Sequence, residues 1–539
     1  MELKAKMLEE RKSRTIWALN AIFAFCFASL FATAKYLRFF TQAGDGASYV
    51  GLVESVRKNF KLDPYLYSSI LNMNQNAWSG IDYWCSSNFS FSTKSNESVL
   101  QWHSYLVAYP FGFLSRLTGV SPAIVVAIAE SLALVLAIIV CAKELGRIGS
   151  GRFYIWLIVG VLIGSPILSI GSSGQLQPER LLVLPIVFIF TQMERFLNSE
   201  RTQKPLVIAA YISGILISER SAMTLFWLTF AYLIMRSPKT FLRPFHNIFL
   251  ILGTASFCWW IIWTTEFENS IYYNQVSLKS MISGLQFSLT DDASNTIKML
   301  LVLFPLIALS IFRWQGLVIG LISLIPNLAV SVGGAEKTSL ITHYHSVYFA
   351  VFFGTATLGA IELSKRSNSF NHKVHASKYV LTAALSLLVA YNFSYSESGN
   401  INPKLIEVNI ESTMSAYGLN LYSRFGDLNS SRIEMIHYVE DIPVGSSISS
   451  PEWTMPALID QGHLSISYYP LGVANADVIF AEIDGDGRIS YLPWLMDHDT
   501  ASAVGMCVFT AINERNLSYV SKQLRSDLMR IEFPPVSEN

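Results

Sequence analysis

The sequence predicts a mainly α-helical fold, a polytopic bundle of transmembrane helices followed by a small C-terminal α/β domain. Three observations predict it. First, 51% of the residues are hydrophobic and only 14% are charged, whereas about a quarter of the residues in a soluble protein are charged. Second, long apolar runs recur within residues 1–393. Third, residues 394–539 are polar, and that stretch is long enough to form a domain.

The first apolar run, residues 15–34, follows a basic segment. It is long for the core of a signal peptide and has no convincing small-residue cleavage site, so we expect an uncleaved span. Basic residues before a first span favour a cytoplasmic N-terminus, and five precede this one: Lys4, Lys6, Arg11, Lys12 and Arg14. We therefore expect a membrane protein whose residues 36–120 form the first loop on the outer side of the membrane.

Together with the first run, later apolar runs give about eleven spans. They cover residues 121–142, 154–172, 181–197, 205–218, 221–235, 245–264, 297–312, 315–331, 345–363 and 378–393. This alternation places the basic clusters between the later spans in the cytoplasm and the C-terminal domain on the outer side.

Two apolar stretches need a separate interpretation. Residues 102–117 would reverse the topology if they spanned, so their aromatic residues and Pro110 favour an interfacial helix. Residues 205–235 are interrupted by Glu219-Arg220, which favours two short spans meeting near the outer surface. A single tilted helix with a buried ion pair is the alternative.

The C-terminal domain contains alternating strand and helix patterns. Residues 446–450, 464–469 and 476–482 have strand character, and residues 452–461 look helical. The run Asp484-Gly485-Asp486-Gly487 resembles a calcium loop, but Leu495 stands where the last acidic ligand would be, which favours a tight turn.

Charge and cysteine content exclude some partners and cofactors. The 39 basic and 39 acidic residues balance, so bulk electrostatics indicate no nucleic-acid partner. The five cysteines include no CxxC pair, which argues against a thiolate metal site. Cys85 and Cys507 both fall on the predicted outer side, where they could form a disulfide or remain unpaired.

Asp45 is the candidate catalytic residue. It follows the first span on the outer side, and flanking Gly44 and Gly46 would let a substrate approach the carboxylate closely. The alternative is an Asp in a turn that caps a helix starting near Ala47. Glu54 on that helix is expected to be solvated or to contact a sugar.

Several residues at the outer ends of spans are candidates for binding an anionic substrate: His103, Glu179, Arg180, Glu219, Arg220, Lys337, His343 and His345. Arg180 could instead pair with Glu179 or reach lipid headgroups. His343 and His345 could supply half of a metal site, but no third ligand accompanies them, so hydrogen bonding to a phosphate or sugar is favoured and no metal cofactor is expected.

The order of several short motifs resembles that of the bacterial "domain of unknown function 2079" membrane proteins. In the membrane part they are Gln101-Trp102-His103-Ser104, Leu176-Gln177-Pro178-Glu179, Ile217-Ser218-Glu219-Arg220, Ile325-Pro326-Asn327 and Thr342-His343-Tyr344-His345-Ser346. In the outer domain they are Ile442-Pro443-Val444-Gly445, Pro456-Ala457-Leu458, Tyr469-Pro470 and Ala476-Asp477-Val478. Gln177 and Arg220 depart from the family, which usually has His and Asp there.

That family in turn resembles the GT-C membrane glycosyltransferases. The resemblance implies a polyprenyl-phosphate-linked sugar donor, an acceptor on the outer face and a catalytic aspartate in the first outer loop, where Asp45 lies. We therefore expect an inverting glycosyltransferase of the bacterial inner membrane, with its first outer loop and C-terminal domain in the periplasm. It would contact membrane lipid and transfer the sugar to a glycan, lipid or protein acceptor. A transporter or flippase of lipid-linked sugars and a non-catalytic membrane scaffold are the alternatives.

Overall fold

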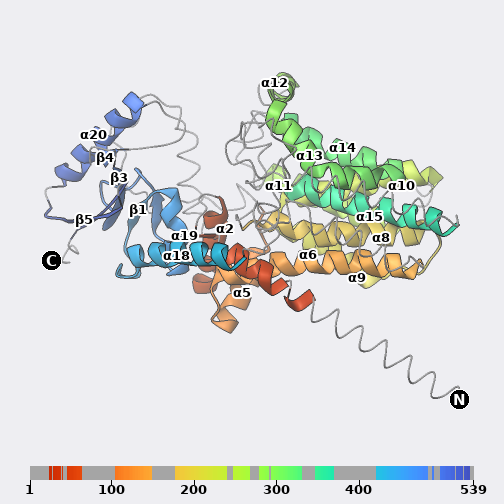
Figure 1. Ribbon diagram of the computed structural model, residues 1–539, viewed down its shortest axis with the longest axis horizontal. Coiled ribbons are helices and arrows are strands. Elements are labelled where there is room, and N and C mark those ends of the chain that lie inside the picture. The colour runs from red at the N-terminus through yellow and green to blue at the C-terminus, as the bar shows by residue number, and fades with distance from the viewer. Residues whose placement is uncertain are drawn as a thin grey trace, which may run out of the picture.

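The structure is a computed structural model with two connected parts, a helical bundle and a C-terminal α/β domain (Figure 1). It describes residues 24–26, 28–37, 39–40, 45–62, 104–148, 176–239, 247–266, 278–290, 293–329, 346–369, 421–483, 489–490, 498–515, 517–525 and 527–533. The predicted spans at residues 154–172 and 378–393 lie outside these ranges.

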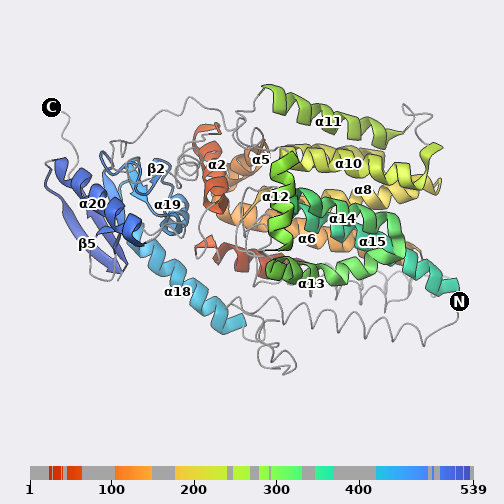
Figure 2. The same cartoon turned by 90° about the horizontal axis from the view of Figure 1, so that it is seen from above.

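The described part of the bundle contains eight long helices. They are α6 (Pro122–Arg147), α8 (Val183–Leu197), α9 (Lys204–Ile217), α10 (Glu219–Arg236), α11 (Ile248–Glu266), α13 (Ala293–Ser310), α14 (Trp314–Ala329) and α15 (Ser346–Ser369). Helix α15 packs against α8, α13 and α14, and nearly all of its apolar stretch is buried, whereas most of α11 is not buried and the helix lies at the periphery (Figure 2).

In the described part of the chain, four helical stretches are long and apolar enough to cross a membrane: Pro122–Arg147, Ile248–Thr265, Leu306–Ile325 and Ser346–Lys365. They support a membrane-embedded chain. Large apolar side chains of α11, among them Ile251, Ile261 and Ile262, are exposed on the bundle surface, as expected for a helix that faces lipid.

The stretch Leu306–Ile325 contains a turn, the 3-10 helix η5 (Ile311–Arg313), so it is not one straight span. Ser288, which precedes α13 in the chain, contacts both helices: its carbonyl accepts a hydrogen bond from Thr296 at 2.6 Å, and its hydroxyl donates to the carbonyl of Leu328 at 3.0 Å. The start of α13 and the end of α14 therefore lie close together, and the two helices form a hairpin.

Helices α9 and α10 are separate, as the favoured interpretation of residues 205–235 expects. The break is at Ser218, whose backbone is extended and whose hydroxyl accepts a hydrogen bond from the amide of Ser221 at 3.1 Å. A side-chain oxygen in this position satisfies one of the free amides at a helix start. The alternative of one continuous tilted helix is wrong.

Basic residues gather at one end of the bundle. Helix α6 begins beside α5 (Ala108–Thr118) and ends at Arg147, about 39 Å away at 1.5 Å per residue. At that far end the arginines pair with buried or partly buried carboxylates: Arg147 and Arg195 with Glu144, Arg236 and Arg313 with Glu194, and Arg313 with Glu362. The sequence assigns these arginines to one side of the membrane, and their cytoplasmic location stays a prediction.

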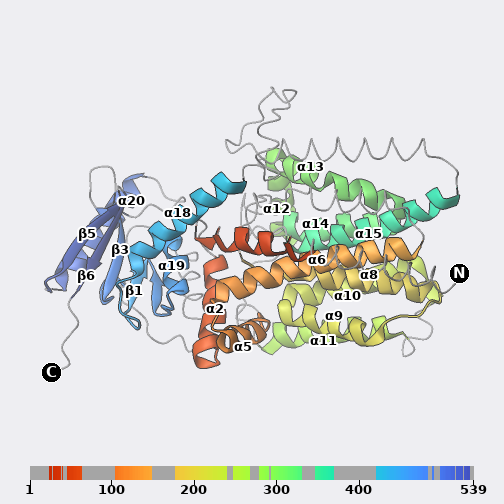
Figure 3. The same cartoon turned by 60° about the horizontal axis from the view of Figure 1, so that its bottom comes forward.

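Further helices lie at the opposite end: α2 (Asp45–Asn59), α5 and the 3-10 helix η2 (Pro178–Leu182), with α12 (Leu278–Leu289) packed on α14. Of these, α2 runs across the direction of the long helices (Figure 3). Helix α5 falls within the stretch expected to form an interfacial helix, and its Phe113, Leu114 and Leu117 are exposed. Helix α12 lies in a stretch for which the sequence predicted no helix.

The C-terminal domain is built on a six-stranded mixed sheet. The strands are β1 (Ile448–Ser450), β2 (Ile466–Tyr468), β3 (Val478–Ile483), β4 (Ile489–Ser490), β5 (Val520–Arg525) and β6 (Leu528–Glu532). Their order is β2-β1-β3-β6-β5, with β4 also paired to β3; β1 is parallel to β2 and β3, and β6 is antiparallel to β3 and β5. The predicted strands and the α/β class are confirmed.

Four helices accompany the sheet: α18 (Leu421–Val439), η8 (Glu452–Thr454), α19 (Met455–Asp460) and α20 (His498–Glu514). Alternate residues of β3 enter different cores, as a period of two requires. Val478 and Phe480 join a core that is continuous with the bundle, and Ile479 and Ala481 face a second core that includes residues of α20.

Residues 484–488, which contain the proposed tight turn, lie outside the described ranges, although the flanking strands pair antiparallel with Ile483 opposite Ile489. Cys507 is disulfide-bonded. Its predicted partner Cys85 lies outside the described residues, and Cys26, Cys141 and Cys258 are free thiols.

Candidate functional site

A buried carboxylate, Glu130 of α6, is the centre of a polar cluster near the C-terminal-domain end of the bundle. It is 2% exposed. Its Oε2 accepts from Lys35 Nζ at 2.5 Å, and its Oε1 accepts from the backbone amide of Gln177 at 2.7 Å. One side chain thus joins three segments that are distant in the chain: residues 28–37, α6 and the start of η2.

Helix η2 adds the pair Glu179 and Arg180 to this cluster. Glu179 is buried, and Arg180 interacts electrostatically with both Glu130 and Glu179. Pro178 occupies the first position of η2, where the missing amide hydrogen is tolerated. A helix therefore begins at Pro178, and its first turn carries two charged side chains, Glu179 and Arg180.

Tyr49 of α2 lies next to these charges. Burial raises the pKa of the Tyr49 hydroxyl well above its ordinary value, and the carboxylates of Glu130 and Glu179 raise it further. The hydroxyl is therefore protonated at physiological pH and can donate a hydrogen bond. Its ring packs edge-on against Tyr105 with the centroids 5.6 Å apart.

A second acidic residue, Glu219, lies at the start of α10. It is fully buried, its Oε2 accepts from the amide of Ser104 at 3.0 Å, and its Oε1 lies 3.8 Å from Arg220 Nε. Ser104 precedes Tyr105, so the contact of Tyr105 with Tyr49 links this pair to the Glu130 cluster.

Several neutral polar side chains in this region are buried and make no hydrogen bond within the described part of the chain. Their atoms are Ser48 Oγ, Tyr49 OH, Ser104 Oγ, both amide atoms of Gln177, Ser346 Oγ and Tyr348 OH. Buried polar atoms nearly always have a partner in native proteins, supplied by protein, water or ligand. Such a concentration next to buried charges is a common property of binding sites.

Of the residues selected from sequence, Glu179, Arg180, Glu219 and Arg220 are brought to one end of the bundle and connected through Tyr49 and Tyr105. Asp45 is the first residue of α2, one helical turn before Tyr49, and nothing further is described of its side chain. His103, Lys337, His343 and His345 lie outside the described residues. Among the described residues, no group of three or more His, Cys, Asp or Glu side chains could hold a metal ion.

Sequence reasoning did not select Lys35, Tyr49, Gln177 or Glu130 as site residues. Glu130 carried a usable signal, because it is the single charged residue between Pro122 and Ala142 in an apolar helix. Ionisable residues inside such helices are rare and mark functional positions. Tyr49 carried no comparable signal, because only the packing of α2 against the bundle buries it.

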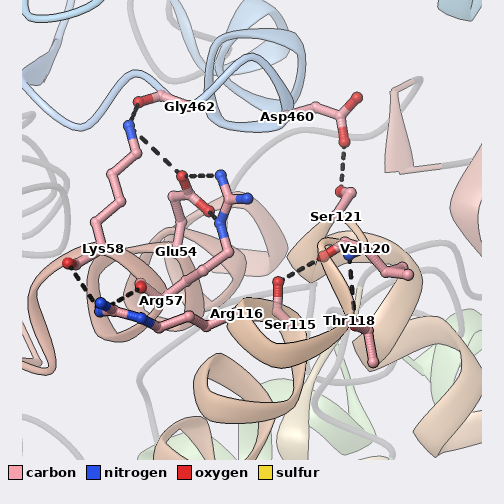
Figure 4. A network of polar contacts seen from close by, with 10 residues as sticks. All are labelled: Glu54, Arg57, Lys58, Ser115, Arg116, Thr118, Val120, Ser121, Asp460 and Gly462. Atoms are coloured by element: carbon pink, nitrogen blue, oxygen red, sulfur yellow. Dashed lines mark hydrogen bonds and ion pairs between the residues drawn. The ribbon is translucent and has the colours of Figure 1, made fainter.

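Another face of α2 contacts the C-terminal domain (Figure 4). Glu54 is fully buried and accepts hydrogen bonds from Arg57 at 2.5 and 2.6 Å, and Lys58 lies 3.6 Å from it and donates to the carbonyl of Gly462. The expectation that Glu54 is solvated or contacts a sugar is wrong, because α19 and its following turn cover this part of α2.

Comparisons with models of known protein families, with curated proteins and with solved structures found no match. The chemistry of the region follows from its own side chains. Carboxylates such as Glu130 can accept protons, guanidinium and ammonium groups can balance a phosphate, and the hydroxyl and amide groups can bind the hydroxyls of a sugar.

Proposed function

We propose that the protein is a membrane glycosyltransferase that moves a sugar, with inversion, from a polyprenyl phosphate to an acceptor on the periplasmic face. The observation that carries the proposal is the buried cluster around Glu130, Tyr49 and Glu179 at one end of an apolar bundle, next to the helix that begins at Asp45. A lipid donor would enter from the bilayer and a polar acceptor from the side of the C-terminal domain. The resemblance in motif order supports the same reaction.

In this proposal Asp45 is the general base. Its carboxylate accepts the proton of the acceptor hydroxyl while the acceptor oxygen bonds to the anomeric carbon of the sugar. The bond from that carbon to the phosphate oxygen breaks, its electron pair stays on the oxygen, and polyprenyl phosphate leaves. Attack opposite to the departing phosphate inverts the anomeric carbon.

Arg180 and Arg220 are the proposed partners of the leaving phosphate, with Lys337, His343 and His345 as further cationic or hydrogen-bonding candidates. Glu179 and Glu219 hold the two arginines, and His103 lies in the chain just before the segment that contacts Glu219. Arg220 is 35% exposed, so its guanidinium can reach a phosphate at the edge of the buried cluster. Charge-assisted hydrogen bonds of this kind are roughly twice as strong as neutral ones.

The test compares Asp45→Asn with Asp441→Asn, which changes an exposed carboxylate of the C-terminal domain. Purified protein in lipid nanodiscs is given polyprenyl phosphates carrying radiolabelled glucose, mannose or galactose together with a cell-envelope extract as acceptor. The expected result is a loss of transfer by about 10²–10⁴-fold in Asp45→Asn only. Full transfer by Asp45→Asn at normal expression would refute the assignment of the base.

A transporter of lipid-linked sugars is the second candidate, because the Lys35–Glu130 pair is an ion pair between two apolar helices. Transport would carry a fluorescent polyprenyl-phosphate sugar across a vesicle membrane without releasing polyprenyl phosphate. Sugar transfer would release polyprenyl phosphate in proportion to the amount of glycosylated acceptor formed. Measuring both quantities in one vesicle preparation separates the two functions.

A further inference from the structure

Within the cluster around Glu130, the described charged side chains balance one another. Lys35 and Arg180 face Glu130 and Glu179, and Arg220 lies beside Glu219. A phosphate at the edge of this cluster stays partly hydrated beside Arg220, which is 35% exposed. An anion enclosed in the interior of the cluster would add a buried charge without a further counter-charge from the described residues, which is unfavourable. A neutral molecule would add none.

The hydrogen-bonding capacity that remains in the described part of this cluster is neutral. Ser48 and Tyr49 are 1% and 0% exposed, Gln177 is 0% exposed, and their hydroxyl and amide atoms have no partner among the described residues. Two hydroxyls and one amide provide both donors and acceptors. A sugar residue, which carries several hydroxyls that donate and accept, has the matching chemistry.

These three residues lie at the same end of the bundle. The backbone amide of Gln177 binds Glu130, Tyr49 interacts electrostatically with Glu130 and Glu179, and buried Ser48 precedes Tyr49 in α2. Tyr49 also lies one helical turn after Asp45, so the two positions share a face of α2. A sugar bound at Tyr49 would be close to the proposed base.

We propose that Ser48, Tyr49 and Gln177 form a subsite for the neutral sugar residue of the substrate, while the phosphate stays at the more exposed edge near Arg220. This inference rests on the proposed function for the identity of the ligand. It assigns binding roles to three residues for which the family resemblance implies no role. It also places recognition of the sugar and recognition of the lipid phosphate at different residues.

The experiment measures binding to the full-length protein in lipid nanodiscs prepared free of glycoside detergents. The probes are the decyl glycosides of glucose, mannose and galactose, and decyl phosphate, which has the same alkyl chain and no sugar. The wild type is expected to bind at least one glycoside. Tyr49→Phe and Gln177→Leu are each expected to weaken that binding roughly five- to tenfold and to leave decyl phosphate binding unchanged.

Tyr211→Phe is the matched control, since Tyr211 is another fully buried tyrosine of the bundle and its hydroxyl is bonded to Thr229. It is expected to leave glycoside binding unchanged. A second readout is the Tm without ligand. Tyr49→Phe should not lower it, because the hydroxyl has no partner among the described residues, whereas a purely structural hydroxyl would lower it on removal.

Three results would overturn the subsite: no glycoside binds the wild type, the variants weaken glycoside and phosphate binding equally, or they weaken neither. The last result means that water alone occupies these polar groups. The outcomes for the proposed function are separate. Glycoside binding without sugar transfer would support the subsite and refute the transferase. Sugar transfer by the wild type, together with unchanged glycoside binding in Tyr49→Phe, would support the transferase and refute the subsite.

Discussion

The hydroxyl of Ser121, the residue before α6, donates a hydrogen bond to Oδ1 of Asp460 at 2.6 Å. The hydroxyl of Tyr36 lies 3.3 Å from the other carboxylate oxygen, and the Arg432 guanidinium lies over the Tyr36 ring at 5.4 Å. The last residue of α19 therefore connects the C-terminal domain to two helices of the bundle. This connection fixes the domain at the end of the bundle that holds the candidate site.

Asp460→Ala is expected to loosen this connection. The variant removes the acceptor for the half-buried hydroxyls of Ser121 and Tyr36, and the loss of each hydrogen bond costs about 0.5–1.5 kcal/mol. Hydrogen exchange of the α2 and α19 amides should speed up while exchange in the distant η5 region does not change. Asp441→Ala, an exposed position in the same domain, is the control. Equal exchange in the two variants would contradict a docking role for Asp460.

His463, in the turn after α19, should make the stability of the protein sensitive to acid. Burial, together with the charges of Lys58 and Arg530, lowers the pKa of His463 from 6.5 to about 4. The unfolded chain therefore takes up a proton near pH 6.5, whereas the folded protein takes it up only near pH 4. Stability is thus complete above pH 6.5 and falls by up to about 3 kcal/mol as the pH drops toward 4.

The measurement is the Tm at a series of pH values between 7.5 and about 4.5. His463→Gln, which cannot titrate, should show a smaller loss of Tm on acidification than the wild type. His437→Gln is the control, because His437 is exposed and paired with exposed Glu440. Parallel pH profiles for wild type and His463→Gln would show that His463 does not govern the acid sensitivity.

Gly359 allows α15 to pack closely on α13. A Cβ at this position would overlap the backbone carbonyl of Leu309, and a backbone atom cannot move aside as a flexible side chain can. Gly359→Ala should destabilise the bundle by about 3 kcal/mol or more, the upper end for overpacking. Gly146, near the end of α6, has open space around it, and Gly146→Ala should stabilise that helix by about 0.5–1 kcal/mol. Opposite shifts in Tm are expected.

The disulfide at Cys507 should stabilise the C-terminal domain. Cys507 belongs to α20, one side of which faces the second core. Reduction, or Cys507→Ser, should lower the free energy of unfolding by about 2–4 kcal/mol. Cys258→Ser, which changes a free exposed thiol, should not. Peptide mapping without reductant should recover the Cys507 peptide joined to the Cys85 peptide, and any other partner would refute the predicted pairing.

A disulfide in this domain also bears on the predicted topology. Stable disulfides form in oxidising compartments such as the periplasm and are rare in the cytoplasm. The domain lies at the opposite end of the bundle from Arg147, Arg195 and Arg313. The periplasmic location of the domain and the cytoplasmic location of the arginines stay predictions, and labelling of engineered cysteines at the two ends by a membrane-impermeant reagent would test them.

Local sequence patterns predicted much of the fold correctly. The helix break at Ser218 could be predicted because a charged pair interrupts an apolar run and serine is a favoured residue at the start of a helix. The central strand β3 was readable because apolar residues run continuously between turn signals. Strand β5 was missed, because its residues are nearly all exposed and polar, and α12 was missed between polar segments.

Only part of the candidate site could be predicted from the sequence. Glu179, Arg180, Glu219 and Arg220 stood out because charges at the ends of apolar helices are conspicuous in any sequence. Their connection through Tyr49 and Tyr105 joins segments separated by dozens of residues, and no local pattern encodes such a contact. Glu54 was misjudged for the same reason, because a polar residue on an isolated amphipathic helix looks solvated until another domain covers it.

The sequence by itself determined that the chain is a bundle of apolar helices with a polar α/β domain, because hydrophobic periodicity and helix signals act over neighbouring residues. Only the tertiary structure decided that Lys35, Glu130, Tyr49 and Gln177 meet in one buried cluster and that the domain docks beside it through Asp460 and Gly462. The physical reason is that burial and pairing of charges depend on contacts between distant segments, which arise only when the helices pack.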